Sequence, residues 1–148
     1  MDLTAIASAI ADRFNAAAIT PPTGYTDPAT ATYRLPNAIT STPTGIVFPP
    51  EGEFSYAAFR RSGNLVFPMR WYIADTSDMP RATDAMYAWG SVLIDQLESQ
   101  YDLDLAPTVT HAVIGTVAFA KLEYADQWYT GFEYPVTVHI EEAFTPTT

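Results

Sequence analysis

In the stretch "GFEYPVTVHIEEAF", residues 131–144, large apolar side chains take every second position from Phe132 to Ile140. A period of two is typical of a β-strand that buries one face and exposes the other. The polar face carries His139 between carboxylates, which are groups that acid–base catalysis uses. The predicted apolar face consists of Phe132, Tyr134, Val136, Val138 and Ile140. The stretch therefore predicts a half-buried strand, whose polar face is either a catalytic surface or the outside of a sheet.

Two amphipathic helices are predicted upstream of this strand. Asp2 is a candidate N-cap of the first, whose apolar residues keep a spacing of three and four as far as about Ala18. Ser77 or Asp78 is the candidate cap of the second. Gly90 lies within the second helix, where glycine costs about 1 kcal/mol of helix stability relative to alanine. We expect that glycine is needed here because another backbone packs closely against it. The apolar stripe of the second helix consists of Ala82, Met86, Trp89, Leu93, Leu97 and Tyr101.

The remaining segments favour short strands. A hairpin is predicted over residues 53–74, with its turn at Ser62-Gly63. Both faces of its second strand are fairly apolar, which indicates a strand covered on both sides. Another strand is predicted from about Val109 to Tyr124, followed by a loop at 125–127. Short extended pieces are predicted at Ala31–Leu35, Ala38–Ser41 and Gly45–Phe48. This order of elements predicts an α+β fold in which two helices pack on one side of an antiparallel sheet.

The length of 148 residues suits one domain with its own core, spanning 1–148. The chain has no cysteine, so disulfides and thiolate metal sites are excluded. We expect no secretory signal, because the first residues lack a basic region. We also expect no membrane partner, because no apolar run is as long as the roughly 18 residues that a span needs.

The net charge of −10 is unevenly distributed. Residues 1–83 contain six arginines and seven acids, whereas residues 84–148 contain Lys121 and ten acids. This asymmetry serves either solubility or a surface that repels phosphate. Tight nucleic-acid binding is disfavoured in both cases, because it needs a basic surface.

Motifs for catalysis are mostly absent from the sequence. The only imidazole side chains are His111 and His139, and neither lies in a known local signature. His139 and Glu141 would share a strand face and could supply two metal ligands, but no further ligand is indicated. Glu133 and Glu141 are about 27 Å apart along a strand, farther than the ~5–10 Å of a glycosidase pair. We therefore predict no catalytic residue, metal or cofactor.

Three segments carry a resemblance to a known family: "LVFPMRWYIA" at 65–74, "PRATDAMYAWGSVLIDQL" at 80–97 and "WYTGFEYPVTVHIEEAF" at 128–144. Together with the first helix and the proline-rich segment after it, they resemble the tail terminator, or tail completion, proteins of long-tailed non-contractile bacteriophages, in particular the actinobacteriophage type. The resemblance covers most of the chain. It rests on element order, size and the closing strand, and on no short diagnostic motif.

The resemblance implies an α/β fold with a mixed or antiparallel sheet and two helices on one face. It further implies a virion protein of the tail and neck, assembled in the host cytoplasm without catalysis or cofactor. Six copies would form a ring that ends growth of the tail tube and joins the tail to the head-side connector. DNA would pass through this ring during ejection without specific binding.

Charge and aromatic residues indicate candidate contact sites for such a ring. The arginines of the hairpin would meet the acidic second half of a neighbouring subunit, and large aromatics near strand ends would act as anchors. Acids of the closing strand would lie on the surface or line the channel. The interface candidates are Arg60, Arg61, Arg70, Trp128 and Tyr129, and the candidate channel or surface acids are Glu133, Glu141 and Glu142.

Three alternatives remain open. The chain could be another neck component, such as a head-closure or adaptor protein. It could be a tail tube subunit, although two strong helices argue against the β-rich fold of that family. It could also be a small enzyme or ligand-binding domain that uses His139 and Glu141.

Overall fold

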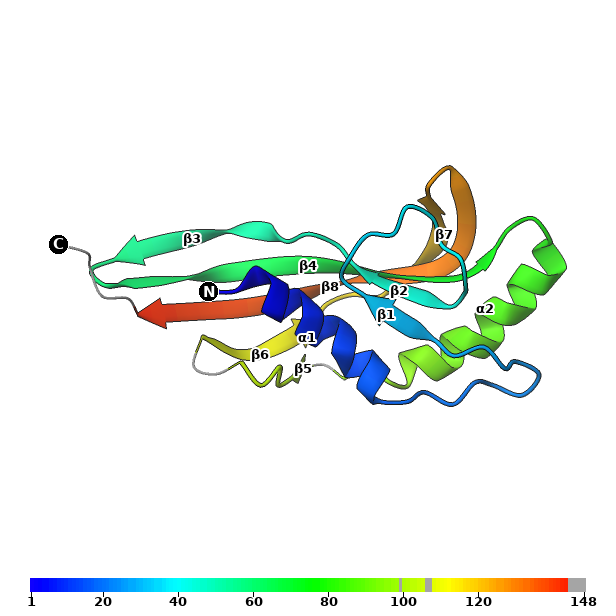
Figure 1. Ribbon diagram of the computed structural model, residues 1–148, viewed down its shortest axis with the longest axis horizontal. Helices are drawn as coiled ribbons and strands as arrows, with labels where there is room; N and C mark the ends of the chain where they lie inside the picture. Colours follow the sequence, from blue (N-terminus) through cyan, green and yellow to red (C-terminus); the bar gives the residue numbers. More distant parts are fainter. Residues whose placement is uncertain (99, 106–107, 144–148) are drawn as a thin grey trace.

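The computed structural model describes residues 1–98, 100–105 and 108–143. Within these ranges the chain forms two helices and a mixed sheet that curls as a half-barrel, with both helices in contact with the sheet (Figure 1). The predicted α+β fold is confirmed. The helices are α1 (Leu3–Ala16) and α2 (Met79–Ile94). The strands are β1 (Thr30–Thr32), β2 (Thr44–Val47), β3 (Glu51–Ala57), β4 (Arg60–Asp75), β5 (Gln100–Tyr101), β6 (Val109–Ile114), β7 (Ala118–Tyr124) and β8 (Gln127–Ala143).

The two longest strands, β4 and β8, form the centre of the sheet. They pair antiparallel from Arg60↔Ala143 to Asp75↔Tyr129. β2 and β3 pair with the far edge of β4, and β6 and β7 pair with the far edge of β8. β1 adds parallel to β2, which makes the sheet mixed. In Figure 1 the β3–β4 hairpin and the end of β8 extend beyond α1 at the left, while α2 lies at the right.

The helix caps follow from the sequence. The carboxylate of Asp2 accepts a hydrogen bond from the Ala5 N–H at 3.1 Å, and that of Asp78 accepts one from the Arg81 N–H at 3.3 Å. Both satisfy backbone donors that a helix start leaves free. α2 ends at Ile94, so Leu97 packs against the core from outside the helix. The side chain of Tyr101, predicted as the last member of the stripe, lies outside the described part.

The main core lies between the helices and the inner face of the sheet. All five apolar positions of the closing stretch, Phe132 to Ile140, are at most 2% exposed, as the alternation predicts. Trp71 of β4 and Leu93 of α2 are fully buried in the same cluster. The polar face of β8 is therefore the outer face of the sheet, and its side chains are half-buried or exposed.

A second, smaller cluster covers the outer face at one end only. It consists of Ile46, Tyr72, Leu122 and Tyr129, with Ile39 and Tyr124 packed against it. The Tyr124 hydroxyl donates to the Pro36 carbonyl, which ties the loop after β1 over this end. β4 is thus covered on both sides near Tyr72 and only on its inner side near Leu65.

The hairpin turn was predicted in the wrong place. It lies at Ala58 and Phe59, and Ser62 and Gly63 pair within the sheet with Ser55 and Phe54. A Cβ atom on Gly63 would lie 2.1 Å from the Glu53 carbonyl oxygen. Glycine is therefore needed here for a close approach of two strands, a role that glycine has inside strands as well as in turns.

Three other expectations need correction. The segment from Val109 to Tyr124 forms two strands, because β6 pairs with β8 as far as Ile114 and β7 begins at Ala118. The segment 38–41 is not a strand, and the strand of this region that pairs with β4 is β2. Gly90 faces side chains instead of a backbone: its Cβ position lies 2.8 Å from Met86 Cε and 3.8 Å from Phe119 Cε1.

Candidate functional site

The β4–β8 pairing brings the arginines of the first half of the chain onto the acids of the second half. Arg61 lies opposite Glu142, and Arg70 lies opposite Glu133, in one continuous register. Arg70 Nε donates to Glu133 Oε2 at 2.8 Å. Arg60 Nη2 is 3.7 Å from Glu141 Oε1, with both side chains more than half exposed. The sequence predicted that these arginines would meet acids of a neighbouring subunit. In the structure they form ion pairs with acids of the adjacent strand in the same chain.

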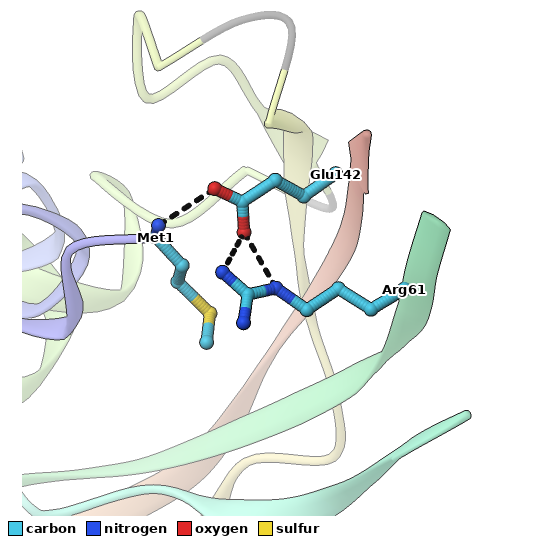
Figure 2. Close-up of polar contacts among 3 residues, drawn as sticks. All are labelled: Met1, Arg61 and Glu142. Carbon is cyan, nitrogen blue, oxygen red and sulfur yellow. Dashed lines mark hydrogen bonds and ion pairs between the residues drawn. The ribbon is translucent and has the colours of Figure 1, made fainter. Parts of the chain in front are cut away.

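The tightest of these contacts also includes the N-terminus (Figure 2). Glu142 Oε2 accepts from Arg61 Nε at 2.8 Å, and Glu142 Oε1 accepts from the Met1 ammonium at 2.7 Å. Glu142 and Arg61 are on the inner face, beyond the apolar end of β8, with side-chain exposures of 20% and 26%. The cluster joins the start of α1 to the ends of the two central strands. The hydrogen bond from the ammonium, followed by that from Arg61, lowers the pKa of Glu142 from its ordinary value of 4.5.

We expect Glu142→Gln to lower the melting temperature at pH 7 and to weaken the dependence of stability on pH under acidic conditions. A carboxyl group with a lowered pKa in the folded state stabilises the fold above its unfolded pKa. That contribution is lost as the pH falls from 4.5 through the lower folded pKa. Thermal unfolding between pH 7 and pH 3 measures the effect. Glu123→Gln, an exposed acid of β7, is the control; an equal response of both variants would contradict the role of Glu142.

Arg70 and Glu133 lie on the outer face, beside the second cluster. The Arg70 guanidinium carbon is 5.1 Å from the Phe48 ring centroid, a cation–π distance. The neighbouring Tyr72 is fully buried, and this burial raises the pKa of Tyr72. Arg70 is therefore held by side chains of its own chain, among them the Glu133 carboxylate and the Phe48 ring.

His139 and Glu141 do share the outer face, but their nearest partners differ. His139 is exposed, and its Nδ1 lies 2.9 Å from Asn64 Oδ1 on the neighbouring strand. Glu141 is directed toward Arg60. Within residues 1–98, 100–105 and 108–143, no three His, Asp or Glu side chains gather in a way that could hold a metal. His139 and Glu141 therefore each have a different intrachain contact on this face.

The two aromatic anchor candidates occupy different environments. Trp128 is 49% exposed, whereas Tyr129 is 7% exposed and packs edge-on against Tyr72, with ring centroids 5.5 Å apart. Trp128 is thus available to a partner at the surface, and Tyr129 belongs to the second cluster.

Sequence reasoning missed two other apolar surfaces. Tyr56 and Phe59, at the hairpin turn, are 68% and 56% exposed. Tyr87 of α2 and Phe119 of β7 are 74% and 61% exposed and line a groove of about 580 Å³. Tyr87 lies off the apolar stripe of its helix, and this position is a signal that the sequence already contained.

Comparisons with known proteins add no relatives. No protein-family model matches the chain, and a search of curated proteins finds no significant match. None of the helices in the described ranges is long and apolar enough to cross a membrane. The fold class and the contacts above are therefore the basis for inferring a function.

Proposed function

We propose that this protein is a structural subunit of a phage virion, forming a ring that caps the tail tube, ends its polymerisation and joins the tail to the head-side connector. The observation that carries the proposal is the arrangement of elements. An N-terminal helix, a proline-rich segment, a long hairpin strand, a second helix and a closing strand form one sheet with both helices on the same face. This is the arrangement that the sequence resemblance implies.

The charge of the molecule is compatible with DNA passing through the ring without being bound. Arg60, Arg61 and Arg70 each have an acidic partner in the same chain, and the net charge remains −10. Such a surface repels phosphate. Because Glu133, Glu141 and Glu142 are those partners, the repulsion depends on the other acids of the chain. Whether the three line the channel remains a prediction.

The proposal is tested by the mass and shape of the purified protein, alone and with tail tubes from the same phage. We expect rings of about six copies that decorate one end of each tube and stop its elongation, visible by negative-stain electron microscopy. Rings that bind only the connector would favour another neck component. Long tubes formed by the protein alone would favour a tail tube subunit. A monomer that ignores both partners would contradict the proposal.

An enzyme that uses His139 and Glu141 is the second candidate, and no contact in the described chain favours it. Replacing both residues by alanine should leave ring formation and tube capping unchanged, because each contacts only an exposed strand neighbour. Loss of capping in this variant, with the melting temperature retained, would assign these residues a direct role in the function.

A further inference from the structure

The turn between β3 and β4 presents an aromatic side chain at a backbone conformation that disfavours it. Phe59 has φ of 61° and is 56% exposed. Glycine or asparagine adopts this left-handed region more easily than a bulky residue does. A strained and exposed phenylalanine contributes little to the stability of its own chain, which suggests a contact outside it. We call Tyr56 to Phe59 the hairpin tip.

A groove that could accept such a side chain lies between α2 and β7. Met86, Tyr87, Ile94 and Phe119 provide apolar walls, and Gly90 forms part of the floor, with Met86 Cε 2.8 Å from its Cβ position. The groove has a volume of about 580 Å³. We call it the α2–β7 groove.

The tip cannot reach the groove of its own chain. Phe119 pairs with Phe132, which pairs with Trp71, eleven residues along β4 from the turn. At about 3.3 Å per residue this separation is about 36 Å. In Figure 1 the hairpin and α2 lie at opposite ends of the molecule. A hairpin tip that enters this groove must therefore come from another copy of the chain.

Charge favours a second copy of this chain as the occupant. Asp95 lines the groove and caps the C-terminus of α2, whose last turn has no basic residue. A carboxylate at this end adds to the negative pole of the helix, so a cation there would be stabilising. Arg60, the first residue of β4, directly follows the tip, and its side chain is 60% exposed with a 3.7 Å contact to Glu141. Tip and groove thus match in both apolar character and charge.

We propose that the hairpin tip of one copy docks in the α2–β7 groove of the next copy, with Phe59 between the apolar walls and Arg60 beside Asp95. The contact is head-to-tail and uses two different surfaces, which is the kind of contact that builds a ring when the rotation from copy to copy closes. This inference rests on the proposed ring and specifies the contact that would hold it together.

Cysteine cross-linking tests the contact directly, because the natural chain has no cysteine. Ala58→Cys labels the tip without removing Phe59, and Ser91→Cys labels the groove. Mixing the two single variants, carried on tags of different mass, should give a mixed dimer with a short bismaleimide linker. The double variant should give a ladder that ends at the ring size. Dimers of Ala58→Cys alone, formed as efficiently as the mixed dimer, would overturn the head-to-tail contact.

Further variants separate docking from folding. Phe59→Gly should raise the concentration needed for ring assembly at least tenfold while leaving the melting temperature unchanged or higher. Leu35→Ser, which removes a side chain of similar exposure elsewhere, should affect neither quantity. Arg60→Asp and Asp95→Arg should each weaken assembly, and the combined charge swap should restore it.

The outcomes distinguish the contact from the function. Wild-type rings that cap tubes, but neither cross-link nor respond to Phe59→Gly, would overturn the docking contact and leave the proposed function intact. A wild-type protein that stays monomeric and does not bind tubes would overturn both.

Discussion

Replacing Gly131 by alanine is expected to destabilise the fold by about 3 kcal/mol or more, a large part of the ~5–15 kcal/mol that holds a domain together. A Cβ atom at this position of β8 would lie 1.9 Å from the Trp71 carbonyl oxygen and 3.1 Å from Leu122 Cδ1. Trp71 and Leu122 belong to the clusters on opposite faces of the sheet. β4 and β8 can therefore move apart at this point only by disturbing the packing of both clusters. Chemical denaturation should show the lower free energy of unfolding.

Gly90→Ala is the matched control. Its Cβ would also come close to an atom, but that atom is the end of the flexible Met86 side chain, 2.8 Å away. Met86 can change rotamer, and alanine gains about 1 kcal/mol of helix propensity over glycine. We expect this variant to be as stable as the wild type or more stable. A similar loss for both variants would show that the backbone contact at Gly131 is not the cause.

Trp71→Ala is expected to cost about 3–5 kcal/mol, because it removes one of the two tryptophans among the largest fully buried side chains. The indole packs edge-on against Phe14 of α1, with centroids 5.1 Å apart, and its Nε1 donates to the Tyr134 hydroxyl at 3.2 Å. A single residue thus links β4 to α1 and to β8. We expect the variant to lose cooperative unfolding or to unfold at a much lower denaturant concentration.

Trp128→Ala supplies the comparison for the same residue type. Trp128 is 49% exposed at the start of β8, and surface substitutions of this kind usually change stability by less than about 0.5 kcal/mol. Ring assembly by the Trp128→Ala variant should be measured as well, because Trp128 is a candidate contact residue between subunits. Equal destabilisation by the two tryptophan variants would contradict the assignment of Trp71 as the centre of the core.

The sequence predicted which types of residue form the candidate site, but it did not predict which arginine pairs with which acid. The sequence shows six arginines in one half and an excess of acids in the other, and this led us to expect contacts between subunits. The fold instead places Arg61 on Glu142 and Arg70 on Glu133, 81 and 63 residues apart in the chain. A charge count carries no information about strand register, so it could not distinguish a contact within the chain from one between chains.

The hairpin tip shows a similar limit. Ser62-Gly63 has the composition of a turn, but Gly63 is required where β3 and β4 approach closely, and the turn falls on Ala58 and Phe59. The exposure of Phe59 depends on this shift, because the predicted turn would have placed it inside a strand. The groove partner, Phe119, is brought to α2 by pairing with β8 and by no local signal.

The closing stretch at 131–144 shows which structural features the local sequence determines and which it does not. Its alternation already specified a strand and the side of that strand that is buried, because side chains in a strand point to opposite faces in turn. The two helices and their caps were specified in the same local way. Neighbours across the sheet were not, since they depend on which distant strands pair and in which register. The β4–β8 pairing sets that register, and it places an intrachain partner beside each of His139, Glu141 and Glu133 on the polar face.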